Sequence, residues 1–430
     1  MSASLSATPF SLSQSQGKPT YAVVGAGVVG LCVALEAQRQ GYQVTLLDGN
    51  EPGRAASFGN AGYLATEVIE PLATPATVRN APKLWLNPDG PVCIPFKYLV
   101  KALPWYAKFL KASSVQQAAL GTQAISALNQ CSQPAWQRTL ADIGHAHLLI
   151  KAGNLVVWED DRQKVAAHQL ASKLQQHHVP CEVVEGQRLA ELEPELSMQL
   201  SHAVYIPEIY RLSDPYEVCQ ALLQAFKERG GHFINEKVMS LQAATQHIEV
   251  HIPGHHHKFD HVSLCAGAWT QTLLEQVGIN VPLEAERGYH LTYPKDQARI
   301  RHTILSADRR FVMSPLNSGL RVVGMSEIGG TELPPIEKRF SVLRKHTKAL
   351  LPKLFTPEEA QASEWMGHRP TLPDSLPIID QHPRFPCLSF AFGHQHLGVT
   401  QAAITAELLL QKVAKRPTSV ALRPYRVDRF

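Results

Sequence analysis

The clearest chemical signal in the sequence is a glycine-rich turn, Gly25-Ala26-Gly27-Val28-Val29-Gly30. In such a turn Gly25 permits a tight bend, Gly27 lets the backbone approach a pyrophosphate, and Gly30 lets the following helix pack closely on the preceding strand. Unpaired N–H groups at the start of that helix favour phosphate. Asp48 follows the next apolar run, where a carboxylate can accept hydrogen bonds from ribose hydroxyls and repels a 2′-phosphate. These residues predict a site for an adenine dinucleotide that lacks this phosphate.

Three later segments bear on which dinucleotide this is. The loop 51–62, which follows Asp48, consists mainly of small and polar residues that can lie along a pyrophosphate and a flavin ring. The segment 265–269 follows a strand that comes far too late in the chain for a simple NAD domain. The segment 393–400, rich in glycine and histidine, opens the last helix. A nucleotide site assembled from such distant parts of the chain favours FAD over NAD.

These turns need a framework, and the apolar pattern predicts one. Residues 21–24 and 44–47 are short apolar runs typical of buried strands. Between them, apolar positions at helical spacing predict a helix over 31–40. Asp214 is a good N-cap, and it is followed by proline at the first position of a further helix. Further elements are expected as strands at 154–158, 233–238, 261–265, 320–325 and 388–391, and as a final helix over 401–413.

Composition excludes several classes of protein. The chain has 430 residues, of which 44% are hydrophobic and 18% charged, enough for a sizeable core in two domains. The net charge of +4 without a basic stripe argues against nucleic acid. Seven scattered cysteines without a C-x-x-C pair fit a reducing compartment, and no apolar stretch is long enough to span a membrane. We therefore expect a cytoplasmic protein, with residues 1–19 as a disordered tail.

At these turns the chain resembles the DAO family of FAD-dependent amine and D-amino-acid oxidoreductases. Within it, the chain is most similar to the bacterial D-amino-acid dehydrogenases, which include D-hydroxyproline dehydrogenases. Six segments match in the family's order, namely 23–30, 56–62, 287–292, 321–328, 367–374 and 393–400. The resemblance implies FAD as cofactor and a D-amino acid, proline or hydroxyproline type included, as substrate. It implies hydride transfer from the α carbon to flavin N5, with electrons passed to a quinone or respiratory carrier.

The resemblance also implies an α/β fold. We expect a Rossmann-type FAD-binding domain built from discontinuous segments, and an α+β substrate domain with a mixed or antiparallel sheet. The FAD-binding domain is expected in 20–92, 200–272 and 360–430, and the substrate-binding domain in 93–199 and 273–359. The aromatic and proline-rich stretch 71–111 departs from the smaller oxidases of the family and fits the dehydrogenase group better.

The predicted cofactor-binding residues lie in the glycine turn, at the acid, in the small-residue loop, after the later strands and in the last turn. They are Gly25, Ala26, Gly27, Val28, Val29, Gly30, Asp48, Gly49, Ala56, Ser57, Asn60, Ala61, Gly62, Val238, Ala266, Gly267, Trp269, Gly367, Gly393, His394, Leu397, Gly398, Val399 and Thr400.

The predicted catalytic residues are Arg369, Tyr289, His394 and His396. Arg369 matches the family's carboxylate-binding arginine, and a guanidinium can grip a carboxylate with two parallel hydrogen bonds. The two histidines are expected near flavin or substrate, the alternative being turn histidines bonded to backbone. Tyr289 is either a substrate contact or a buried core residue. The chain has Phe311-Val312 where some relatives place a tyrosine, which indicates a more apolar pocket.

Several alternatives stay open. One is a glycine- or sarcosine-type oxidase that uses oxygen, and another is a flavin-binding subunit active only with a partner. The stretch 92–111 mixes aromatic residues with four lysines. It is compatible with peripheral contact at the inner face of the cell membrane, with a pocket wall or with a core helix. The three consecutive histidines at 255–257 cannot all point at one ion, so no metal site is predicted.

Overall fold

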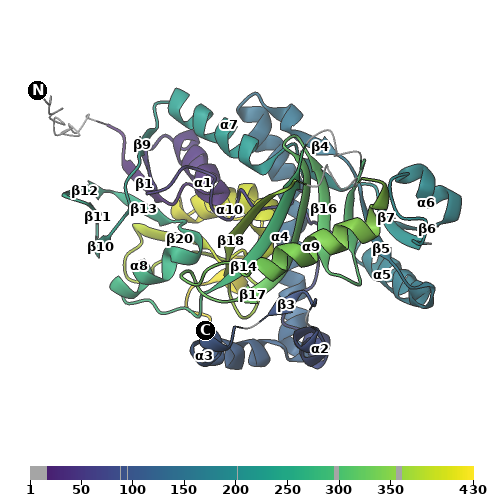
Figure 1. Ribbon diagram of the computed structural model, residues 1–430. Coiled ribbons are helices and arrows are strands. Elements are labelled where there is room, and N and C mark those ends of the chain that lie inside the picture. Colours follow the sequence, from purple (N-terminus) through teal and green to yellow (C-terminus); the bar gives the residue numbers. More distant parts are fainter. Residues whose placement is uncertain (1–16, 88, 94, 201, 295–299, 355–360) are drawn as a thin grey trace, which may run out of the picture.

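A computed structural model gives the architecture of the chain (Figure 1) and describes residues 17–87, 89–93, 95–200, 202–294, 300–354 and 361–430. Residues 1–16 of the predicted tail lie outside the described residues. A six-stranded and a nine-stranded sheet organise the molecule, with a three-stranded and a two-stranded sheet beside them. No helix in the described ranges has the length and apolar character needed to cross a bilayer.

The six-stranded sheet has the order β19-β20-β13-β1-β2-β9, and its neighbours are parallel except for the β19–β20 pair. Its strands are β1 (Thr20–Val24), β2 (Gln43–Leu47), β9 (His232–Ile234), β13 (His261–Leu264), β19 (Ile378–Gln381) and β20 (Leu388–Phe392). Strands from three distant parts of the chain therefore share one sheet, which confirms the Rossmann-type arrangement from discontinuous segments.

Both faces of this sheet are covered, which is why its strands read as continuous apolar runs. On β1, Tyr21 and Val23 face the core formed with four helices, whereas Ala22 and Val24 face the core on the opposite side. The four helices are α1 (Val28–Arg39), α4 (Val115–Asp142), α7 (Pro215–Glu228) and α10 (Gly398–Val413). The opposite side is covered by α8 (Thr270–Gln276) and by β10 (Ser240–Ala243), β11 (Ile248–Ile252) and β12 (His255–Phe259).

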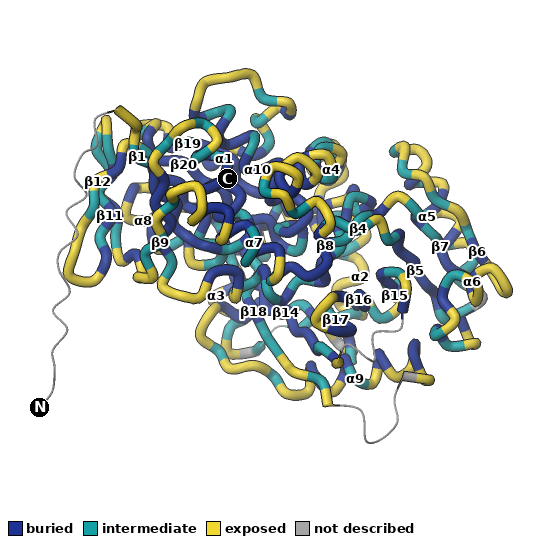
Figure 2. The backbone as a smooth tube through the Cα atoms, turned by 90° about the horizontal axis from the view of Figure 1, so that it is seen from above, coloured by how far each residue is buried: buried dark blue, intermediate teal, exposed yellow. Residues whose placement is uncertain are grey.

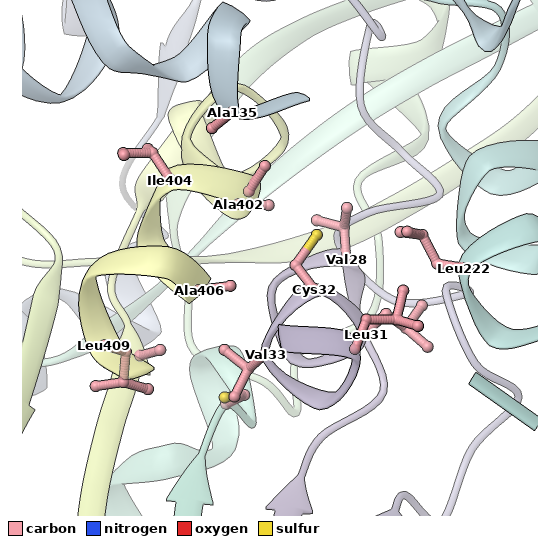
Figure 3. Packing of buried hydrophobic residues seen from close by; sticks show 14 of the residues in the cluster. Val28, Leu31, Cys32, Val33, Ala135, Leu222, Ala402, Ile404, Ala406 and Leu409 are labelled. Atoms are coloured by element: carbon pink, nitrogen blue, oxygen red, sulfur yellow. The ribbon is translucent and has the colours of Figure 1, made fainter. Parts of the chain in front are cut away.

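Helix α1 sits between two other helices. Figure 3 shows Cys32 of α1 facing Ala402 of α10 and Leu31 facing Leu222 of α7, all within one buried apolar cluster. Small residues on α10 allow the two helices to approach closely. The glycine turn at the start of α1 is therefore anchored by the largest core of the protein.

The nine-stranded sheet has the order β18-β14-β17-β16-β15-β5-β7-β6, with β3 paired to β17. It is mixed, because the β15–β5 and β17–β3 pairs are parallel and the others antiparallel. Its strands are β3 (Val92–Cys93), β5 (Asn154–Trp158), β6 (Glu182–Glu185), β7 (His202–Ile206), β14 (Glu284–Tyr293), β15 (Thr303–Ser306), β16 (Phe311–Leu316), β17 (Gly319–Ile328) and β18 (Ser363–Thr371). The predicted mixed sheet is confirmed.

Helices flank this second sheet. Helix α9 (Glu337–Leu350) crosses its outer face, where Phe340 and Leu343 pack with Tyr289 and Leu291 (Figure 1). The remaining elements are α2 (Pro75–Leu86), α3 (Phe96–Ala112), α5 (Lys164–Gln176), α6 (Gly186–Leu192), β4 (Leu149–Lys151) and β8 (Tyr210–Leu212). Figure 2 shows the buried residues gathered in the sheets and the helices between them, with exposed residues on the outer helices and turns.

The structure differs from the expected domain boundaries in three places. Strands β7 and β18, which we expected in the FAD-binding segments, lie in the nine-stranded sheet. Helix α4, expected with the substrate domain, packs on α10, and Trp136 Nε1–H donates to the Val399 carbonyl at 2.8 Å. Composition cannot tell to which of two sheets an apolar segment belongs, because both sheets bury the same residue types.

Several element boundaries also differ from the prediction. Helices α1 and α10 start at Val28 and Gly398, each before the predicted start at 31 or 401. Strand β17 is longer than the predicted strand 320–325, and β9 is shorter than the predicted strand 233–238. The histidines at 255–257 lie on strand β12 beyond the turn, with side chains that alternate along the strand.

Candidate active site

A cavity of about 1410 Å³ runs between the two sheets. Its lining comes from the glycine turn, the loop 56–62, the turns after β13 and β20, the inner face of the nine-stranded sheet, and helices α2 and α3. The distant segments singled out in the sequence therefore meet around one space.

The glycine turn forms one end of this cavity. Gly25 has a left-handed φ of +106°, and a Cβ there would lie 2.5 Å from the Cys265 carbonyl oxygen. A Cβ at Gly30 would lie 1.8 Å from the Gly25 carbonyl oxygen, so Gly30 serves helix packing and does not line the cavity. Gly27 does line it, and α1 starts there without a side-chain cap. This is the open approach that a pyrophosphate needs.

Asp48 lies at the same end. Its Oδ2 accepts from the Ala26 N–H at 2.7 Å and its Oδ1 from the Asn50 N–H at 2.9 Å. A carboxylate has about four acceptor positions. Asp48 therefore keeps acceptor capacity for ribose hydroxyls, while its bonds to the backbone fix its orientation. Ala26 itself contributes through this bond and does not line the cavity.

The loop 56–62 is held from both sides. Ser57 Oγ accepts from the Val28 N–H at 3.0 Å, which ties the loop to α1. From the other sheet, Arg321 Nη1 donates to the Phe58 carbonyl at 2.6 Å and the Asn60 carbonyl at 3.2 Å, and Nε donates to Thr292 Oγ1 at 2.8 Å. Burial lowers the pKa of Arg321 to about 10. Arg321 thus fixes the cofactor loop to the nine-stranded sheet.

Trp365 fills the space between that loop and β18. A Cβ at Gly59 or at Gly367 would lie within 1.9 Å of the indole ring, so both glycines are needed for the ring to fit. The indole stacks on His290 with ring centroids 4.9 Å apart. Gly367 lines the cavity, and its lack of a side chain is explained by this ring.

The turns after β13 and β20 complete the cofactor end. The cavity is lined by Ala266, Gly267 and Trp269 after β13, and by His394, Gly398 and Val399 after β20. Other predicted residues that line it are Val238 after β9, and Val29, Gly49, Ala56, Asn60 and Ala61. Four predicted residues stand behind the lining and hold the turns, namely Gly62, Gly393, Leu397 and Thr400. For example, Thr400 Oγ1 accepts from the Ala65 N–H at 2.9 Å. The start of α10, without a side-chain cap, lies at the cavity.

These residues fit FAD. Two helices, α1 and α10, start at this cavity, and the N-cap residue of neither makes a side-chain cap, although the Val28 N–H of α1 donates to Ser57. The first suits a pyrophosphate, and the second suits the negative charge that a reduced flavin gains near N1 and O2.

Arg369 lies on the inner face of β18, directly opposite Glu286 of β14. Its Nη1 donates to Glu286 Oε1 at 2.8 Å and to the Met325 carbonyl at 3.1 Å. Among the described residues, none accepts from its Nε or Nη2. The guanidinium is therefore fixed at one nitrogen and presents two N–H-bearing nitrogens to a ligand.

Glu286 is buried and lines the cavity. Its Oε1 also accepts from Ser326 Oγ at 2.8 Å, and its Oε2 accepts from Thr371 Oγ1 at 3.0 Å. Burial alone would raise the pKa of this carboxyl, but the Arg369 guanidinium and the Ser326 hydroxyl outweigh burial and hold the pKa below its usual value. Glu286 is thus an ionised carboxylate in the cavity wall.

A bulge in β17 shapes this corner. Tyr289 pairs with Gly324 and Arg287 with Glu327, so β17 has one extra residue between these positions. Met325, inside the bulge, has a left-handed φ of +63°. The bulge brings both the Met325 carbonyl and the Ser326 hydroxyl to the Arg369–Glu286 pair.

Of the two interpretations of Tyr289, the structure agrees with the buried core residue, because Tyr289 does not line the cavity. Its side chain is buried on the outer face of β14, where the hydroxyl donates to Glu327 Oε2 at 2.7 Å and accepts from the Ile336 N–H at 3.1 Å. Glu327 also pairs with the buried Arg287. Side chains alternate along a strand, so Glu286 and Gly288 face the cavity and Tyr289 faces α9.

The two histidines of the last turn differ in environment. His394 lines the cavity and is buried, and its Nε2 lies 3.0 Å from Thr405 Oγ1 of α10. His396 lines the cavity near Glu286 and Arg369. Burial lowers the pKa of both imidazoles far below the usual value, which makes them neutral near pH 7. They can donate or accept a hydrogen bond there, but they add no charge.

Much of the remaining lining is apolar. It includes Val312 and Val323 of the nine-stranded sheet, Trp105, Tyr106 and Phe109 of α3, and further apolar residues of α2. Trp105 reaches the Arg369 corner, where its Nε1–H donates to the Thr371 carbonyl at 3.3 Å. Val312 lines the cavity, whereas Phe311 belongs to the core behind the sheet.

Sequence reasoning missed Glu286, Met325 and Trp365. Glu286 precedes Gly288 by two positions, so strand alternation places both on one face, and this signal was available. The left-handed Met325 and the ring of Trp365 between two glycines depend on the pairing of β14 with β17 and β18, for which the sequence carries no local signal.

The fold and the cavity together define a flavoprotein oxidoreductase. The chain belongs to the DAO family, FAD-dependent oxidoreductases, whose model matches residues 20–412. It is 32% identical over 417 residues to the D-amino-acid oxidase of Bradyrhizobium diazoefficiens, covering 95% of this chain and 98% of that protein. The predicted family, cofactor and enzyme class are confirmed. The protein is an FAD-dependent amino-acid oxidoreductase.

Solved structures show the same fold. Glycine oxidase from Geobacillus kaustophilus superposes with a TM-score of 0.77 at 18% identity, covering 96% of this chain and 99% of that one. L-proline dehydrogenase from P. horikoshii gives 0.74 at 17% identity, covering 96% and 98%. The predicted fold class is confirmed.

Proposed function

We propose that the protein oxidises a D-amino acid at its α carbon, proline and hydroxyproline types included, and passes the electrons to a quinone or respiratory carrier. The observation that carries this proposal is the free edge of Arg369. Glu286 and the Met325 carbonyl fix Nη1, which leaves Nε and Nη2 for two parallel bonds to a carboxylate. FAD, when bound, supplies the acceptor that takes the hydride at N5.

The residues around Arg369 suggest how a substrate is oriented. A carboxylate held at two points cannot rotate, so the α carbon keeps one face toward the cofactor. Val312 and Val323 offer an aliphatic wall for a side chain or a ring. Hydride transfer starts from the neutral amine, so a substrate that binds with a cationic nitrogen must first lose one proton. After that deprotonation the transfer needs no further base. The name of the 32% identical relative supports the D configuration.

The proposal that a quinone or carrier accepts the electrons is supported by the surface of α2 and α3. Both helices line the cavity on one side, and their outer surface carries Arg79, Lys83, Lys97, Lys101, Lys108 and Lys111. Exposed apolar side chains lie among them, with Val100 78% and Leu103 54% exposed. A basic and apolar surface at a cavity wall suits the edge of an anionic bilayer, from which a quinone could be reached.

The test is anaerobic bleaching of the bound flavin by a panel of D-, L- and N-methyl amino acids. We expect D-amino acids, D-proline among them, to bleach it fastest. Arg369→Leu should raise the substrate requirement at least about tenfold while FAD stays bound. Arg344→Leu is the control, because Arg344 pairs with Glu364 away from the cavity. If no member of the panel bleaches the flavin, the proposal is wrong.

The name of the same relative favours a second candidate, an oxidase that reduces oxygen. The two candidate functions can be distinguished by the rate of hydrogen peroxide release in the presence of oxygen. An oxidase releases hydrogen peroxide as fast as substrate disappears, whereas a dehydrogenase needs an added quinone to reach that rate.

A further inference from the structure

We propose that Glu286 is a second recognition residue, which selects substrates carrying a cationic nitrogen next to the carboxylate held by Arg369. This inference rests on the proposed function. It adds that the site recognises the zwitterion as a whole, with one charged side chain for each end.

The two side chains form a fixed pair of opposite charges. They are direct partners across β18 and β14, and Nη1 lies 2.8 Å from Oε1. The side chains are 18% exposed for Arg369 and 6% for Glu286, and both line the cavity. An α-amino acid carries its carboxylate and its ammonium group on the same α carbon. A neighbouring guanidinium and carboxylate are complementary to that arrangement.

Glu286 keeps room for one more donor. Its carboxylate offers about four acceptor positions. Ser326 and Arg369 use two of them on Oε1, and Thr371 uses one on Oε2. One position remains on Oε2, which an N–H of the substrate can fill.

No other charge offsets Glu286 at this corner. The imidazole of His396 is neutral near pH 7. Arg310 also lines the cavity, but it is exposed on the turn before β16, and Asp48 and Lys237 lie at the nucleotide end. The Arg369–Glu286 pair therefore has no net charge. A simple carboxylate would gain the guanidinium but face the Glu286 charge, whereas a zwitterion satisfies both groups.

The test uses two ligands of the same shape that cannot be oxidised. 2-Aminoisobutyrate has no α-hydrogen and is a zwitterion, and pivalate replaces its ammonium with a methyl group. Their binding to the holoenzyme is followed by the change in the flavin absorption spectrum. We expect the wild type to bind 2-aminoisobutyrate at least about tenfold more tightly than pivalate.

Glu286→Gln should move the two ligands in opposite directions. Binding of 2-aminoisobutyrate should weaken about tenfold, and binding of pivalate should strengthen, because the repelling charge is gone. A merely structural role for Glu286 would weaken both. Glu286→Asp should keep the preference for the zwitterion. Glu364→Gln, which removes a negative charge from β18, the strand of Arg369, at the pair with Arg344, should change neither affinity.

Three results would overturn the inference. They are a wild type that prefers pivalate, a Glu286→Gln variant in which both affinities move together, and one in which neither moves. The first result is measured on the wild type, so it is obtained even if the Glu286→Gln variant does not fold. If Arg369→Leu leaves both affinities unchanged, the proposed carboxylate site itself is wrong. If Arg369→Leu loses affinity for both ligands while Glu286→Gln changes neither affinity, the carboxylate site at Arg369 is supported and only the role of Glu286 is rejected.

Discussion

The guanidinium of Arg369 lies against the backbone of Gly288, so close that a Cβ at residue 288 would fall 2.3 Å from Nη2 and 2.4 Å from Cζ. We expect Gly288→Ala to displace the guanidinium from its place beside Glu286. The value of kcat/KM for the best D-amino acid should fall at least about tenfold, mainly through KM. Steady-state kinetics measure this change, and FAD content and the unfolding temperature show whether the protein is otherwise intact. Unchanged kinetics would show that Arg369 does not depend on Gly288.

Local sequence patterns carry part of this site. The glycine turn, the acid after β2 and the late turns after β13 and β20 each have the residue types that their position requires. All four therefore indicated a dinucleotide site before any pairing was known. Arg369 could be identified from the sequence because it lies in the segment 367–374, which matches the family. These features depend on residues close together in the chain.

The rest depends on pairing between distant strands. Tyr289 was a candidate substrate contact because it stands in a matching motif, but strand alternation turns it toward α9 and exposes Glu286 and Gly288 instead. Alternation tells which residues share a face, but not which face meets the cavity. The bulge that aims the Met325 carbonyl at Arg369 needs the register of β14 on β17. Helix α4 packs with the FAD-binding segments because its apolar face contacts α10. The amino-acid composition along the chain does not show this contact.

Arg321 should control retention of FAD. It is buried and fixes the Phe58 and Asn60 carbonyls of the cofactor loop. In Arg321→Met these carbonyls lose their donor, and the loop loses its anchor to the nine-stranded sheet. We expect FAD to bind about tenfold more weakly, as measured by recovery of flavin fluorescence on dilution. Arg344→Met changes a partly exposed residue of α9 that does not line the cavity, and this variant should bind FAD like the wild type. Equal FAD affinity in Arg321→Met would mean that the loop is held without this side chain.

Glu67 should make stability depend on pH. Its Oε1 accepts from Asn154 Nδ2 at 2.9 Å, whereas its buried Oε2 has no donor among the described residues. Burial raises the pKa of Glu67 from 4.5 to about 7. The unfolded chain therefore releases this proton at lower pH than the folded protein does, and stability falls as the pH rises from 4.5 to 7.

Glu67→Gln removes that titration. Relative to the wild type, the variant should gain about 2 kcal/mol in the free energy of unfolding between pH 5.5 and 8.5. Urea unfolding of the holoenzyme at the two pH values measures the difference. The control is Glu70→Gln, because Glu70 forms an exposed ion pair with Lys173. Its stability relative to the wild type should not change between the two pH values. A constant difference between Glu67→Gln and the wild type would show that Glu67 titrates normally.

Leu103 on α3 tests the proposed membrane surface. Its side chain is 54% exposed and stands among the lysines of α3. Because such a surface binds by apolar burial together with attraction to anionic lipid, Leu103→Glu opposes both contributions. We expect the wild type to sediment with vesicles of anionic lipid but not with neutral ones, and Leu103→Glu to lose at least about tenfold in affinity. Val165→Glu introduces the same charge at a position that is 65% exposed on α5, far from these lysines in the sequence, and should bind like the wild type. If the wild type does not bind anionic vesicles, or if both variants lose binding equally, α3 is not the membrane contact. Its exposed apolar residues then need another explanation.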